Sequence, residues 1–132
     1  VEHHWNELLK FSRRSEYAMN RWAARYGYEH TPKAIMDKAK KGGNGRYAAV
    51  NLCNYHTVEF RLFRGTLKYN TFIATIQLVN HICDVAMYNT DDSIAKLSWS
   101  DFVADITEPE LVQYLKERQL YINEEVQTEE EM

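Results

Sequence analysis

Residues 57–65 read TVEFRLFRG, and this stretch decides the fold that the chain can form. Alternate side chains of a β-strand point to opposite faces of the sheet. One face of this strand would be apolar and would face the core, with Val58, Phe60 and Leu62. The other face would carry Thr57, Glu59, Arg61 and Phe63. The carboxylate of Glu59 and the guanidinium of Arg61 would lie about 6.5–7 Å apart along the strand. The stretch therefore predicts a half-buried strand with one charged face.

A partner strand is predicted immediately upstream. Residues 47–52 and 57–63 are rich in β-branched and aromatic residues, and turn-forming residues separate them, which predicts an antiparallel β-hairpin. With residues 54–56 as the loop, Asn51 lies opposite Glu59. Asn51, Glu59 and Arg61 then share one surface, and two further arginines flank the hairpin at the same end, Arg46 before it and Arg64 after it.

Short helices are predicted before the hairpin. Apolar spacing indicates a helix over residues 3–12, and Ser15 would cap a second helix that Gly27 ends, unless the two form one bent helix. A further helix is expected over residues 31–39, because a threonine cap is followed there by a first-turn proline.

A long helix is predicted after the hairpin, from a cap at Asn70 to about Tyr88. Its buried face would comprise Phe72, Ile76, Val79, Cys83 and Ala86. Ile73, Ile82 and Val85 widen that face until most of the helix is expected to be buried. Ser98 would cap the next helix, and a last one would open at residues 107–110 and bury Leu111, Tyr114 and Leu115.

The composition is that of one globular domain. The chain has 132 residues, of which 45% are hydrophobic and 27% are charged. No uninterrupted apolar run approaches the ~20 residues that cross a bilayer, and no signal-peptide pattern opens the sequence. Two cysteines without metal-ligand spacing favour a reducing compartment. We expect a cytoplasmic α+β domain over residues 1–123 and a disordered acidic tail over residues 124–132.

The positive charge is concentrated in the first third of the chain. Residues 10–46 contain ten basic and three acidic side chains. Such a run either faces an anion, for example a nucleotide phosphate, or is a solvated surface. We do not expect this run to bind nucleic acid.

A hairpin alone leaves its sheet edges unprotected. Open edges expose unpaired backbone donors and acceptors, and an isolated hairpin is marginally stable in water. We therefore expect added strands from an upstream part of a longer protein or from a second copy, unless the hairpin lies wholly under helices.

The charged face of the hairpin has two interpretations. Glu59 and Arg61 could form an incidental ion pair on a solvated surface. Alternatively, Glu59 is a hard oxygen ligand suited to Mg²⁺, and the nearby arginines hold phosphoryl oxygens while charge moves from a nucleotide to an acceptor.

The order of these segments resembles a known family. RYAAVNL at residues 46–52, a turn, TVEFRLFRGTL at residues 57–67 and a helix that opens at Asn70 resemble the C-terminal catalytic part of the amidoligases. These belong to the glutamine synthetase and glutamate–cysteine ligase superfamily of carboxylate–amine ligases. Glutamine synthetases have R-S-A-S-I-R-I, a turn, R-I-E-V-R-F-P-D and a helix that begins N-P-Y-L. The resemblance covers mainly residues 44–85 and implies that the hairpin belongs to a glutamine-synthetase-like sheet flanked by helices.

The resemblance assigns roles to the hairpin residues. Glu59 matches the magnesium-binding glutamate, and Arg61 matches an arginine that contacts substrate or the transferring phosphate. Arg46 matches an arginine associated with the nucleotide phosphate and the acyl phosphate. Asn51 follows the amidoligase pattern where glutamine synthetase has arginine, and Arg64 stands in a segment that varies within the family. The implied reaction is activation of a carboxylate by ATP as an acyl phosphate, followed by its capture by an amine, either substrate being free or peptide-linked.

One part of the family pattern is missing from this sequence. The family takes further metal-binding carboxylates from earlier strands, commonly as E-x-E, and nothing before Arg46 resembles that motif. The chain is thus expected to supply the C-terminal half of an ATP- and Mg²⁺-dependent ligase, and its own catalytic domain would then be incomplete. The alternative is a noncatalytic binding or assembly module derived from that fold.

Overall fold

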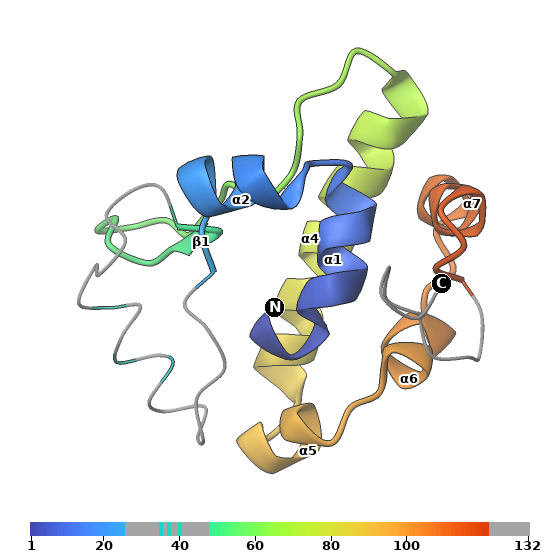
Figure 1. Cartoon of the computed structure of the whole chain (residues 1–132). Coiled ribbons are helices and arrows are strands. Elements are labelled where there is room, and N and C mark those ends of the chain that lie inside the picture. Colours follow the sequence, from blue (N-terminus) through green and yellow to red (C-terminus); the bar gives the residue numbers. More distant parts are fainter. Residues whose placement is uncertain (26–34, 36, 38–39, 41–47, 122–132) are drawn as a thin grey trace.

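The computed structural model describes residues 1–25, 35, 37, 40 and 48–121 (Figure 1). Most of the predicted helix over residues 31–39, Arg46 and the tail over residues 124–132 lie outside this part. The second helix, which was expected to run to Gly27, instead ends at Trp22, and residues 23–25 are not helical. What is described is α+β: helices together with a two-stranded antiparallel sheet. The prediction of this fold class is confirmed.

Two separate helices open the chain. A 3₁₀ turn, η1 (Glu2–His4), leads into α1 (Trp5–Ser12), and α2 (Glu16–Trp22) follows after a sharp turn. Arg13 has a left-handed backbone with φ of 62°, which ends α1 and excludes one bent helix. The Ser15 side chain accepts a hydrogen bond from the Ala18 N–H, as predicted for a cap.

The hairpin has the predicted register. Strands β1 (Val50–Asn51) and β2 (Glu59–Phe60) are antiparallel, with Asn51 opposite Glu59. The Arg61 N–H donates to the Ala49 carbonyl at 2.8 Å and continues the ladder by one bond. The strands are nevertheless much shorter than the predicted residues 47–52 and 57–63.

The short strands change the environment of two side chains. Phe60 and Leu62 pack in the core as predicted, but Val58 is 54% exposed because it precedes the paired segment and belongs to the open loop. Phe63 was expected on the charged face and instead packs edge-on against Phe11, with ring centres 5.7 Å apart. Strict alternation ends with the strand at Phe60, so it no longer dictates where Phe63 points.

One edge of the hairpin is partly covered from within the chain. Ala24, just after α2, forms a parallel bridge with Ala48, and its carbonyl accepts a 2.8 Å hydrogen bond from the Ala49 N–H. Figure 1 shows α2 beside β1. Pairing with upstream strands or a second copy stays a prediction.

The long helix α4 (Tyr69–Tyr88) begins one residue before the predicted cap at Asn70, with Lys68 at the cap position and no side-chain cap bond. Its buried face agrees with the predicted one only at Ile82 and Val85, and most of the helix is not buried, contrary to expectation. Phe72 and Ile76 are 53% and 49% exposed, and the residues that are buried or packed against the core are Thr71, Ala74, Leu78, Ile82 and Val85. Apolar residues occur nearly all round this helix, so its own periodicity could not select the face that other helices cover.

Three short helices complete the described chain: α5 (Asp91–Ala95), α6 (Trp99–Ala104) and α7 (Pro109–Glu117). The predicted Ser98 cap and first-turn proline of α7 are confirmed, whereas α5, capped by Thr90, was not predicted. α7 packs against α4, where Gln77 accepts from the Leu111 N–H at 3.0 Å and donates to Glu110 at 3.0 Å. Leu111, Tyr114 and Leu115 are buried as predicted.

Candidate functional site

Three of the predicted site residues meet at one carboxylate oxygen of Glu59. Asn51 Nδ2 lies 3.4 Å from Glu59 Oε1, and Arg61 Nη1 lies 3.7 Å from the same oxygen. Asn51 is only 4% exposed, and its Oδ1 accepts a 2.9 Å hydrogen bond from the Cys53 N–H. The hairpin register therefore brings the predicted amide, carboxylate and guanidinium together.

The charged side chains at this site remain accessible to solvent. The Glu59 side chain is 42% exposed and that of Arg61 is 29% exposed. An ion pair that is this open contributes little to folding stability. Its atoms can therefore exchange partners with an incoming ligand at small cost.

Arg14 is a member of the site that the sequence did not place there. It lies in the turn between α1 and α2, and its Nη2 donates a 3.2 Å hydrogen bond to the Phe63 carbonyl, 49 residues further along the chain. Burial, followed by the charges of Arg61 and Arg64, holds the pKa of Arg14 below its ordinary value. The sequence showed a basic pair at residues 13 and 14 but had no signal that tied it to the hairpin. We refer to Arg14, Arg61 and Arg64 as the arginine cluster.

Of the two remaining predicted arginines, the structure describes Arg64 but not Arg46. Arg64 is exposed and its charge acts on Arg14, which places it beside the predicted site. Arg46 is outside the described residues. Its predicted phosphate role stays a prediction.

Among the described residues, Glu59 is the carboxylate that the structure places at the predicted metal site. Within the described ranges, no group of three or more histidine, cysteine, aspartate or glutamate side chains is arranged to hold a metal ion. Glu59 alone, with Oε1 already near Asn51 and Arg61, does not make up a magnesium site.

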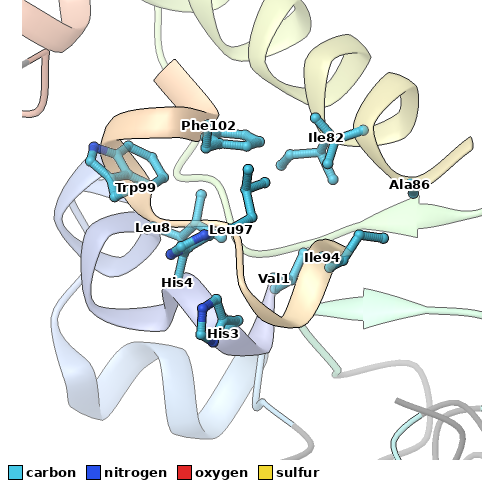
Figure 2. A pocket seen from close by; sticks show the side chains of 11 residues that line it. Val1, His3, His4, Leu8, Ile82, Ala86, Ile94, Leu97, Trp99 and Phe102 are labelled. Carbon is cyan, nitrogen blue, oxygen red and sulfur yellow. The ribbon is translucent and has the colours of Figure 1, made fainter. Parts of the chain in front are cut away.

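A small apolar cavity of about 90 Å³ lies elsewhere, between the N-terminal turn, α4 and the segment from α5 to α6 (Figure 2). His4 is in its wall, with its ring 5.6 Å from that of Trp99 and 6.0 Å from that of Phe102. Burial lowers the pKa of His4 to about 4, helped by the nearby charges of His3 and the chain's first amino group and opposed by a hydrogen bond with the Leu97 backbone. No hairpin residue lines this cavity, so it is separate from the predicted site.

No family model, curated protein or solved structure matches the chain. No helix among the described residues combines the length and apolar character of a membrane span.

Proposed function

We propose that this chain is the C-terminal part of an amidoligase-like, ATP-dependent carboxylate–amine ligase that acts through an acyl phosphate. The observation that carries the proposal is the convergence of Asn51 and Arg61 on Glu59, with Arg14 and Arg64 beside them. Such a reaction makes little use of covalent protein chemistry and depends on positioning and charge neutralisation. A cluster of guanidinium groups on a hairpin suits both requirements.

The proposed reaction has two steps. The carboxylate of one substrate attacks the terminal phosphoryl group of ATP, which gives an acyl phosphate and releases ADP. An amine, free or peptide-linked, then attacks the acyl carbon and phosphate leaves, so an amide bond replaces the carbon–oxygen bond to phosphate. Arg61, and Arg46 and Arg64 on the basis of the resemblance, would bind the phosphoryl oxygens.

Glu59 and Asn51 would orient this machinery. Glu59 Oε1 lies near both the Asn51 amide and the Arg61 guanidinium, and Asn51 is fixed by its bond to the Cys53 N–H. Side chains that are held in place before the substrate binds need no costly rearrangement during the reaction.

The magnesium part of the proposal depends on groups from outside the described residues. Mg²⁺ prefers near-octahedral oxygen coordination and supplies charge neutralisation of phosphates when bound. Glu59 could give one ligand, and further carboxylates would have to come from residues outside the described part. The same parts, or a second copy, would supply the strands expected beside the hairpin, and the free cysteines suit the predicted cytoplasmic location.

Substitution of Glu59 and Arg61 tests the proposal. In the natural protein that contains this sequence, Glu59→Gln should abolish Mg²⁺-supported ATP turnover, because it removes a hard anionic ligand. Arg61→Lys should lower turnover severely, because an ammonium group cannot reproduce the bidentate guanidinium fork. Turnover is measured as phosphate release with a panel of carboxylates and amines.

Arg21→Gln provides the matched control. Arg21 is exposed on α2, where it donates to the Tyr17 hydroxyl at 3.1 Å, and its loss should leave turnover unchanged. If the natural protein neither binds nor hydrolyses ATP and is indifferent to Glu59→Gln, the ligase proposal is wrong. The noncatalytic binding or assembly module would then take its place.

A further inference from the structure

We propose that Arg14 joins Arg61 and Arg64 to form a binding site for a doubly charged phosphoryl group. Its assignment to a phosphate of ATP rests on the proposed function, whereas binding of a phosphoryl anion does not. The juxtaposition that carries the inference is the hydrogen bond between Arg14 Nη2 and the carbonyl of Phe63, the residue that directly precedes Arg64.

The backbone at Arg14 is fixed before any ligand binds. Arg13 adopts the left-handed conformation that ends α1, and the Arg14 N–H donates to Ser12 Oγ at 3.1 Å. Ser12 is buried, and its hydroxyl in turn donates to the Leu9 carbonyl at 2.7 Å. The turn between α1 and α2 is thus tied to the last turn of α1.

The hairpin side of the site is tied to the same helix. Phe63 packs its ring against Phe11 of α1, 5.7 Å between ring centres, while its carbonyl accepts from Arg14. In Figure 1 the turn between α1 and α2 lies next to the segment that leads from β2 to α4. Two segments far apart in the sequence are therefore held together where Arg14 meets the residue that precedes Arg64.

Arg14 is incompletely bonded in this position. Its Nε is covered by protein and has no hydrogen-bond partner among the described residues. Nor does any described carboxylate form an ion pair with Arg14 or Arg64. A partly buried cation without a counter-charge is costly, and an anion that binds beside it recovers part of that cost.

The charges indicate what kind of anion fits. Among the described groups of the site, three guanidiniums stand against the single carboxylate of Glu59, an excess of two positive charges. The charges of Arg61 and Arg64 add to burial in lowering the pKa of Arg14. A dianionic phosphoryl group balances this excess, whereas a lone substrate carboxylate does not. Guanidinium forks also match the oxygen spacing of phosphoryl groups.

Titration of the 132-residue chain with inorganic pyrophosphate tests the inference. Calorimetry at low salt should show binding to the unsubstituted chain, and Arg14→Gln should weaken it about tenfold or more, because a charge-assisted contact is lost. Arg21→Gln removes the same charge from an exposed position of α2 and should leave the affinity nearly unchanged. Because the two variants have equal net charge, a difference between them reports a local site and not a general attraction of anions.

A second variant keeps the test decisive if Arg14→Gln does not fold. Arg64 is exposed, so Arg64→Gln should preserve the circular dichroism spectrum and the melting temperature and still weaken pyrophosphate binding. Absence of pyrophosphate binding, or equal affinity of the Arg14→Gln and Arg21→Gln variants in folded form, would overturn the inference. Pyrophosphate binding without any ATP turnover in the natural protein would remove the ligase proposal and leave the anion site standing.

Discussion

Asn51 is a buried polar side chain with both ends of its amide occupied. Its carbonyl oxygen accepts from the Cys53 N–H, and its amide nitrogen faces Glu59. A buried amide that is hydrogen-bonded at both its oxygen and its nitrogen is tolerated in a core and is held in one orientation. At the scale of single residues, Asn51 connects the core of the hairpin to its charged surface.

His4 is a titratable residue that folding holds in its neutral form. Burial lowers its pKa from the ordinary 6.5 to about 4, so between these two values the unfolded chain binds a proton that the folded chain does not. The free energy of unfolding should therefore fall as the pH is lowered from about 6.5 to about 4, and His4 should add no further loss below that range. Urea unfolding at pH 7 and pH 4.5 measures the effect, and NMR of the imidazole gives the midpoint directly.

His56 offers a control for the His4 prediction, because it is exposed in the hairpin loop. The His4→Gln variant should lose less stability than the unsubstituted chain between pH 7 and pH 4.5, while His56→Gln should lose as much. An imidazole midpoint for His4 near 6.5 would show that the ring is not buried in solution.

At the scale of elements, α4 is the helix whose two faces can be told apart by mutation. Leu78 is fully buried against the rest of the core, whereas Phe72 is 53% exposed. Leu78→Ala should lower the free energy of unfolding by about 2–5 kcal/mol, because it deletes buried methyl groups and leaves a cavity. Phe72→Ala should cost much less, and urea denaturation of both variants provides the comparison. If Phe72→Ala lowered the free energy of unfolding more than Leu78→Ala does, the face predicted from the sequence would be the buried one.

At the scale of the whole molecule, Glu59 is the carboxylate that the described residues place at the predicted metal site. We expect this chain alone to bind Mg²⁺-ATP with a dissociation constant in the high-micromolar range or above, and to form no amide, because further oxygen ligands for Mg²⁺ are needed. Calorimetry and a phosphate-release assay test both expectations. Submicromolar binding with turnover would mean that metal ligands exist within this chain that the described residues do not reveal.

The features that the sequence determined are local ones. The caps at Ser15 and Ser98 were predicted correctly, because a cap depends on a side chain and a backbone N–H three residues apart. The pairing of Asn51 with Glu59 was also correct, because the register of a hairpin depends on side-chain alternation in segments close in sequence, although the loop is longer than the predicted residues 54–56. The approach of Asn51 and Arg61 to Glu59 follows from that register.

Tertiary packing decided what these local signals left open. α4 is apolar nearly all round, so only its contact with α7 and the rest of the core selected Leu78 over Phe72 for burial. Arg14 reached the hairpin because the left-handed turn at Arg13 and the packing of Phe11 on Phe63 bring residues 49 positions apart into hydrogen-bond distance. Local spacing carries no information about such contacts, since they exist only once the helices and the hairpin share one core.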